Sequence, residues 1–246
     1  KPGSPYLKYY EYIKEHGYSR HLYEFKDEYA NMPVDVQKDE KKGLYYVQKE
    51  KKRLYFRKST PAKKIQKYYR ALSMEQDRRS PHHYFNSVKE VTGKVFVDVG
   101  CAEGYSSLEI IEEAKHVYLF EQDEQWLEAI RATFEPWQDK VTIVQKYVSD
   151  HNSSREQTLD DFFNNQTNEH LFLKMDIEGA ERHALAGCNN LFQNCQKLDF
   201  AICTYHLRDD EEVISAFLDK HNCTYINQKG FFRHKIRSVV MRGSKK

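Results

Sequence analysis

VFVDVGCAEG, residues 95–104, begins as a buried β-strand, yet Asp98 stands near the end of that strand. Gly100 and Gly104 follow four residues apart and predict a tight loop that leads into a helix. A loop that binds a pyrophosphate reads GxGxxG and follows a strand that is apolar throughout. Here the middle glycine is absent, and Asp98 and Glu103 both add negative charge. The stretch therefore favours a positively charged, amine-bearing ligand at the carboxyl ends of the strands.

The next apolar run, HVYLFE at residues 116–121, also ends in a carboxylate, Glu121. An acidic residue at the end of the second strand can accept hydrogen bonds from both hydroxyls of a ribose. A ribose joined to an amine-bearing, positively charged group describes S-adenosylmethionine (SAM). The alternative interpretation is that Asp98 stands at a solvated strand end and binds nothing.

Strands and helices alternate from residue 91 to the end of the chain. The predicted strands are residues 94–99, 116–121, 140–148, 170–176 and 198–206. The predicted helices that follow them are residues 104–115, 123–134, 159–163, 181–187 and 209–221. This alternation predicts βαβ units in a parallel sheet. The last two predicted strands, CTYINQ (223–228) and IRSVVMR (236–242), have only a short link and should pair antiparallel.

Residues 1–90, which we call the N-terminal region, differ from the rest in charge and composition. They carry 21 Lys and Arg against 12 Asp and Glu, whereas residues 91–246 carry 18 against 25. Thirteen of the 18 tyrosines lie in the N-terminal region. Its pattern predicts a helix over residues 5–30, a hairpin of residues 44–48 and 53–58, and a helix that Thr60 caps before Pro61. We therefore expect an α+β extension that precedes a domain of residues 91–246.

The length of 246 residues allows one large domain, or one domain with an extension. No run reaches about 18 apolar residues, so the sequence predicts no membrane span, and its polar start predicts no signal peptide. Five cysteines at irregular spacing favour reduced thiols in the cytoplasm over disulfides or a zinc site. The sequence does not indicate an oligomeric state.

Several stretches resemble the FkbM-type class I SAM-dependent methyltransferases. VDVGCAEG resembles their first motif, YLFEQD the acidic second motif, and QKYVSD the segment after the third strand. LKMDIEGAERHALAG, residues 173–187, resembles their strand-four signature and is the most specific match. SPHHY, residues 80–84, is similar to a short upstream segment of related members. The resemblance implies an α/β fold with a seven-stranded, Rossmann-like methyltransferase sheet whose last strand is antiparallel.

The resemblance also implies which residues bind SAM. Asp98, Gly100 and Gly104 would line its methionine end, and Glu121 would bind the ribose. Gln122 would lie beside the adenine, with Ser149 and Asp150 near the adenine edge. Asp176, at the end of the fourth strand, would border the reaction centre.

Methyl transfer to a hydroxyl benefits from a general base. The candidates follow the fourth and fifth strands: Lys174, Asp176, Glu178, Glu181 and His206. We predict that His206 is the base, since histidine suits proton abstraction at neutral pH, and that Asp176 and Glu178 assist at the same catalytic site. Asp176, Glu178 and His206 could also ligate a divalent metal, but their spacing is not specific, and we predict none. Glu181 is either a residue at a helix start or a functional carboxylate.

The function that we predict is O-methyl transfer from SAM to a hydroxyl of a sugar or glycoconjugate. The acceptor follows from the resemblance alone. One alternative is an RNA methyltransferase that uses the basic N-terminal region, because basic patches mixed with aromatic rings bind nucleic acid. Against it, the chain lacks the Pro-Pro-aromatic signature of amino-methyltransferases after the fourth strand. A second alternative is a non-catalytic SAM-binding module. The basic charge could also be a solvated face, or hold an anionic acceptor.

Overall fold

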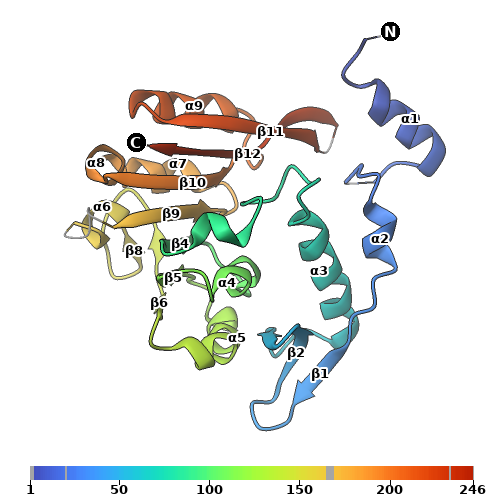
Figure 1. Ribbon diagram of the computed structural model, residues 1–246, viewed down its shortest axis with the longest axis horizontal. Helices are drawn as coiled ribbons and strands as arrows, with labels where there is room; N and C mark the ends of the chain where they lie inside the picture. Colours follow the sequence, from blue (N-terminus) through green and yellow to red (C-terminus); the bar gives the residue numbers. More distant parts are fainter. Residues whose placement is uncertain (1–2, 20, 165–168, 233, 246) are drawn as a thin grey trace.

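The computed structural model describes residues 3–19, 21–164, 169–232 and 234–245. Its centre is a seven-stranded sheet of order β11-β12-β10-β9-β4-β5-β6 (Figure 1). The strands are β4 (Val95–Val99), β5 (His116–Phe120), β6 (Val141–Val144), β9 (His170–Met175), β10 (Lys197–Cys203), β11 (Thr224–Phe232) and β12 (Lys235–Lys245). Neighbours from β6 to β10 run parallel, and β12 is antiparallel to both β10 and β11. The predicted fold class and the antiparallel closing pair are confirmed.

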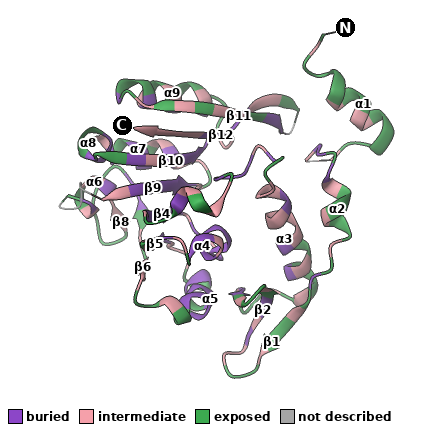
Figure 2. Cartoon of the chain, in the orientation of Figure 1, coloured by how far each residue is buried: buried purple, intermediate pink, exposed green. Residues whose placement is uncertain are grey.

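Helices cover both faces of the sheet, because the central strands are apolar on both sides. One face packs against α4 (Tyr105–Ile110) and α5 (Glu124–Phe134). The other packs against α6 (Leu159–Phe162), α7 (Glu181–Ala186), α8 (Asn189–Asn194) and α9 (Asp210–Lys220). Within β4, Phe96 belongs to the α4 side and Val97 to the opposite side. Since side chains alternate along a strand, Asp98 points to the α4 side as well. Figure 2 shows the central strands as buried.

The N-terminal region forms helices and a small sheet, and the small sheet lies beside the α4 and α5 face (Figure 1). Its elements are α1 (Leu7–His16), α2 (Lys26–Ala30), β1 (Val36–Asp39), β2 (Leu44–Lys49), β3 (Lys52–Tyr55), α3 (Ala62–Glu75) and the 3₁₀ helix η1 (Val88–Val91). The amide of Tyr55 in β3 donates to Thr133 Oγ1 in α5 at 3.0 Å. The small sheet and the large domain therefore share one hydrophobic core.

In the N-terminal region the structure confirms one predicted element and contradicts two others. The hairpin of β2 and β3 is confirmed, although β1 adds an unpredicted third strand. The single helix over residues 5–30 is wrong, because α1 ends before Gly17, whose φ of 76° leaves the helical region. Thr60 is not the cap of α3, since Pro61 occupies that position and makes no side-chain capping bond.

Other boundaries differ in the large domain. The predicted strand 140–148 is divided, because the amide of Lys146 bonds back to the carbonyl of Val144 at 3.0 Å and turns the chain. Its second part, β7 (Tyr147–Val148), pairs with β8 (Glu156–Gln157) in a separate sheet. Helix α4 ends five residues earlier than predicted, and α8 was not predicted. Asp123 caps α5, since its carboxylate accepts the amide of Gln125 at 2.9 Å.

None of the five cysteines is in a disulfide. Within the described part of the chain, every helix is too short or too polar to cross a membrane.

Candidate active site

A cavity of about 1070 Å³ opens at the carboxyl ends of the parallel strands. This volume is at the upper end of the roughly 300–1000 Å³ that small-molecule sites occupy. Most of the predicted site residues line it: Asp98, Gly100, Glu121, Gln122, Ser149, Asp150, Asp176 and Glu178. Gly104 and His206 are not among the lining residues. Gly104 instead starts α4, where a Cβ would collide with the ring of Phe134.

The glycine loop lies close against the end of β9. Gly100 has a φ of 76°, and a Cβ on it would collide with the backbone carbonyl oxygen of Asp176. Only glycine fits this close approach without displacing the neighbouring chain. The loop and Asp176 are therefore held side by side at the floor of the cavity.

Asp98 is paired with a buried cation. Its side chain accepts a hydrogen bond from Ser107 Oγ at 2.6 Å, and Lys174 Nζ lies 2.7 Å from its Oδ1. Lys174 neighbours Asp98 across the strands and also donates to the carbonyl of Gly100 at 2.7 Å. Burial alone would lower the pKa of Lys174, but the charges of Asp98 and Asp176 outweigh it and raise that pKa. Much of the negative charge of Asp98 is thus neutralised within the protein.

Glu121 joins the glycine loop to the start of α5. One of its oxygens accepts the amide of Ala102 at 3.0 Å, and the other accepts the amide of Asp123 at 2.8 Å. Each carboxylate oxygen has a further acceptor site, so Glu121 can still receive hydroxyl donors from the cavity. Gln122, Ser149 and Asp150 line the same cavity.

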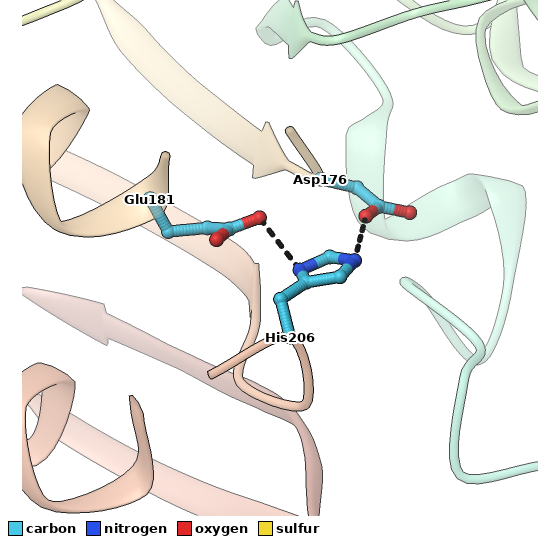
Figure 3. Close-up of side chains that lie close together, drawn as sticks. All are labelled: Asp176, Glu181 and His206. Atoms are coloured by element: carbon cyan, nitrogen blue, oxygen red, sulfur yellow. Dashed lines mark ion pairs between the residues drawn. The ribbon is translucent and has the colours of Figure 1, made fainter. Parts of the chain in front are cut away.

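Asp176, Glu181 and His206 form a cluster at the end of β9 (Figure 3). His206 Nδ1 lies 3.0 Å from Glu181 Oε1, and Nε2 lies 3.5 Å from Asp176 Oδ1. Nε2 is also 3.5 Å from Glu178 Oε2, on a side chain that is 91% exposed. Burial would lower the pKa of His206, but Glu181, followed by Asp176 and Glu178, outweighs it and raises that pKa. The predicted catalytic residues therefore do come together, with His206 behind the Asp176 carboxylate rather than on the cavity wall.

Donor atoms of Asp176, Glu181 and His206 lie within 4.8 Å of one another, a spacing that a metal ion could use. Figure 3, however, shows the imidazole ring between the two carboxylates. Each ring nitrogen faces a different carboxylate, with Nδ1 toward Glu181 and Nε2 toward Asp176. The absence of a metal stays a prediction.

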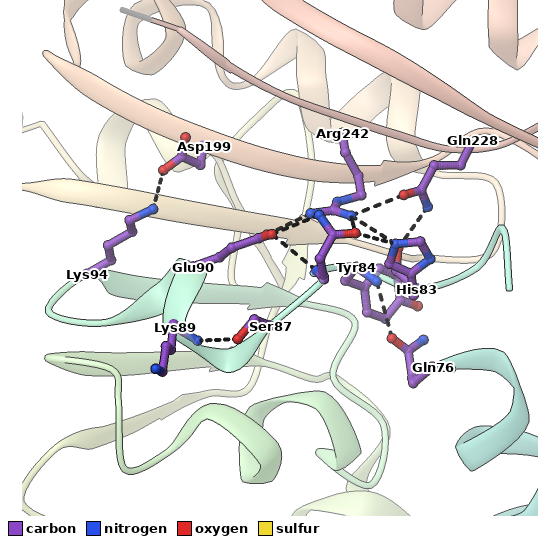
Figure 4. Close-up of polar contacts among 11 residues, drawn as sticks. Gln76, His83, Tyr84, Ser87, Lys89, Glu90, Lys94, Asp199, Gln228 and Arg242 are labelled. Carbon is purple, nitrogen blue, oxygen red and sulfur yellow. Dashed lines mark hydrogen bonds and ion pairs between the residues drawn. The ribbon is translucent and has the colours of Figure 1, made fainter. Parts of the chain in front are cut away.

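One contact to this cluster comes from the N-terminal region and was missed from the sequence. The hydroxyl of Tyr84 donates to Asp176 Oδ2 at 2.7 Å, and Lys174 Nζ lies 5.3 Å from the centre of the Tyr84 ring. The segment around Tyr84 is fixed to β11 and β12 by a polar network (Figure 4). In it, Arg242 bonds Glu90 at 2.6 Å, and Gln228 donates to the carbonyl of His83 at 2.9 Å. The resemblance of SPHHY was the only sequence signal for this contact.

A second group from the N-terminal region reaches the glycine loop. The hydroxyl of Tyr68 in α3 donates to Glu103 Oε2 at 2.8 Å. Burial raises the pKa of Glu103, although the bond from Tyr68 opposes this. Arg57 lies 4.1 Å from the ring centre of Trp126 and pairs with Asp123 at 3.1 Å. The N-terminal region therefore forms one wall of the cavity.

Comparison with known families matches residues 62–226 to the FkbM methyltransferase domain, which is well over half of the chain. The chain belongs to the FkbM methyltransferase family. The matched residues include α3 and the Tyr84 segment, as well as the glycine loop and the cluster around His206. No curated protein matches the chain.

Solved structures of methyltransferases are similar to this FkbM methyltransferase in fold. One is methyltransferase FkbM from Methylobacillus flagellatus, at 21% identity and a TM-score of 0.49 over 61% of this chain and 43% of that one. This chain thus matches less than half of that neighbour's length. Another is magnesium protoporphyrin IX methyltransferase from Synechocystis with bound SAM, at 12% identity and a TM-score of 0.46 over 76% and 85%. A third is a putative methyltransferase from Streptococcus mutans in complex with S-adenosylhomocysteine, at 14% identity and a TM-score of 0.41 over 64% and 91%.

Proposed function

We propose that this FkbM methyltransferase uses SAM to methylate a hydroxyl group of a sugar or glycoconjugate. The observation that carries the proposal is the cluster of Asp176, Glu181 and His206 beside the glycine loop of a large cavity. It offers a buried imidazole between carboxylates, at the strand ends where ligands bind in open α/β sheets. Such a group is suited to take a proton from a hydroxyl at neutral pH.

The charge of the cavity supports SAM as the cofactor. Its acidic lining residues are Glu75, Asp98, Glu103, Glu121, Asp123, Asp150, Glu156, Asp176 and Glu178, against three Lys and Arg. This charge suits a ligand that carries an amine and a sulfonium. Glu121 would accept the ribose hydroxyls, Asp98 and Gly100 would lie at the methionine end, and Gln122, Ser149 and Asp150 at the adenine end. When bound, SAM supplies an electrophilic methyl group and keeps the bonding electron pair on its sulfur as the methyl leaves.

The residues of this chain would orient the acceptor and take its proton. Asp176 lines the cavity, and its Oδ1 lies 3.5 Å from His206 Nε2, so a hydroxyl placed against Asp176 would reach the imidazole through this carboxylate. As the hydroxyl oxygen forms its new bond to carbon, its proton would pass by way of Asp176 to Nε2. Tyr84 holds the other oxygen of Asp176, so that Oδ1 stays turned toward the ring.

The lining also supports a neutral acceptor over RNA. Its three Lys and Arg are already engaged: Arg57 with Asp123, Lys174 with Asp98, and Lys146 with the carbonyl of Ser153. A phosphate backbone would meet carboxylates there, and binding to RNA relies on Lys and Arg. The cavity instead offers the rings of Tyr68, Tyr84 and Tyr205, and tyrosine presents an apolar face with a polar tip. Sugar rings fit such a surface.

The test is turnover with labelled SAM against separate pools of glycans and RNA, with the methylated products identified by mass. We expect label in a glycan fraction, with the added mass on a hydroxyl oxygen. Label in RNA alone would replace the proposal with the RNA methyltransferase alternative. Binding of SAM without transfer to either pool would favour a non-catalytic module.

A further inference from the structure

We propose that Glu181 is a positioning residue, which holds His206 with a proton on Nδ1 so that Nε2 faces Asp176 and can take the acceptor's proton through it. This inference rests on the proposed function and goes beyond it, because sequence alone left Glu181 as a residue at a helix start or a functional carboxylate. Three observations on the Glu181 and His206 pair carry the inference.

The first observation is the burial of Glu181. Its side chain is fully buried, with 0% exposure, at the start of α7. Burying a carboxylate is costly unless a charge or hydrogen-bond donor compensates it.

The second observation is what compensates that burial. Glu181 Oε1 accepts the amide of Ile177 at 2.9 Å and lies 3.0 Å from His206 Nδ1. The amide fixes the carboxylate, and the carboxylate in turn faces one nitrogen of the ring. Because Ile177 directly follows Asp176, one backbone turn sets the positions of Glu181 and Asp176 together.

The third observation is the asymmetry around the ring. Nδ1 is 3.0 Å from its carboxylate, whereas Nε2 is 3.5 Å from both Asp176 and Glu178. The ring of Tyr205 is centred 4.1 Å from that of His206 and is tilted by 40° to it. A neutral imidazole carries a single proton. That proton is more stable on Nδ1, because Nδ1 faces the nearer and fully buried carboxylate of Glu181. The lone pair of Nε2 is then directed toward Asp176, which lines the cavity, so a hydroxyl proton can reach Nε2 through that carboxylate.

The test uses the full chain and titrates His206 by nuclear magnetic resonance of its ring nitrogens. In the wild-type protein, the neutral ring should carry its proton on Nδ1. A neutral ring that is protonated on Nε2 would overturn the proposal. This measurement needs no acceptor, so its result is independent of whether the protein methylates sugars.

Glu181→Gln is the informative variant, because the amide oxygen can keep both contacts while the charge is lost. The pKa of His206 should fall by about 1 to 3, as expected when an opposite charge within about 4–6 Å is removed. If the protein turns over a hydroxyl acceptor, the acidic limb of its rate profile should move to lower pH by the same amount. An unchanged His206 titration in Glu181→Gln would overturn the proposal.

Asp210→Asn is the matched control. Asp210 is also a fully buried carboxylate, and it accepts the amide of Leu207, next to His206. Its other partner is Arg182 rather than the imidazole. We expect Asp210→Asn to lower stability without moving the titration of His206. An equal fall of the His206 pKa in both variants would show a general effect of disturbing the loop, and would contradict a specific role for Glu181.

Discussion

The large domain and the N-terminal region both contribute polar groups to one cavity, but they do so in different ways. The large domain supplies carboxylates and an imidazole at the carboxyl ends of its parallel strands. Ligands of open α/β sheets bind at these strand ends. The N-terminal region supplies hydroxyls, from Tyr84 to Asp176 and from Tyr68 to Glu103. The large domain therefore holds most of the charged groups of the cavity, to which the N-terminal region adds Arg57, Glu75 and the two orienting hydroxyls. If this division is right, substitutions in the two regions should differ in the size of their effect and in whether they change turnover or SAM binding.

The largest effect is expected from removing the imidazole of the large domain. His206→Ala should lower turnover by about 10²–10⁴-fold, the usual contribution of a general base. Affinity for SAM, measured by calorimetry, should stay nearly unchanged, because His206 does not line the cavity. His170→Ala is the control, since His170 also pairs with a carboxylate, Asp199, but at the start of β9. Loss of SAM binding in His206→Ala would show that His206 has a structural role and would contradict its role as the base.

A smaller effect, on binding rather than turnover, is expected at the ribose position. Glu121→Ala should weaken SAM binding by roughly tenfold or more, because one charge-assisted hydrogen bond contributes about 1.5–3 kcal/mol. Calorimetric titration with SAM and S-adenosylhomocysteine measures this directly. Wild-type affinity in the variant would refute the ribose assignment, and would leave Glu121 as the link between Ala102 and Asp123.

The N-terminal region should give a still smaller effect, on turnover only. Tyr84→Phe removes the donor to Asp176 Oδ2 and keeps the ring, so we expect turnover to fall by about tenfold, as for one bond to a charged group. Tyr29→Phe is the matched control, because Tyr29 donates to Asp77 at the same 2.7 Å, away from the cavity. A loss in Tyr84→Phe that equals that of His206→Ala would contradict a merely orienting role for the N-terminal region.

No effect is expected from removing metal ions. Activity should persist in excess chelator, because Glu181 and Asp176 face different nitrogens of the imidazole. The measurement is the rate before and after dialysis against chelator. Complete loss that magnesium or manganese restores would make Asp176, Glu178 and His206 metal ligands.

The sequence predicted the fold and the cavity floor because both depend on local patterns. Asp176 and His206 each follow an apolar run, and parallel strands bring the ends of such runs to one edge. The contacts of Tyr84 and Lys174 could not be predicted from local sequence patterns. Tyr84 reaches Asp176 across 92 positions, and Lys174 meets Asp98 only through the register of β4 and β9. The end of β6 was missed for the opposite reason, since one tight turn at Lys146 overrides an apolar pattern that continues to Val148.

The central claim is that His206 accepts the proton of the acceptor, and the pH dependence of kcat/KM tests it most directly. The base must be neutral, and the carboxylates around His206 raise its pKa above the ordinary 6.5. The rate should therefore fall as the pH drops through that raised pKa, with the midpoint of the acidic limb above pH 6.5. We predict that this limb is present in the wild-type protein and absent from the residual activity of His206→Ala. An acidic limb that persists unchanged in His206→Ala would contradict the account and would place the base elsewhere.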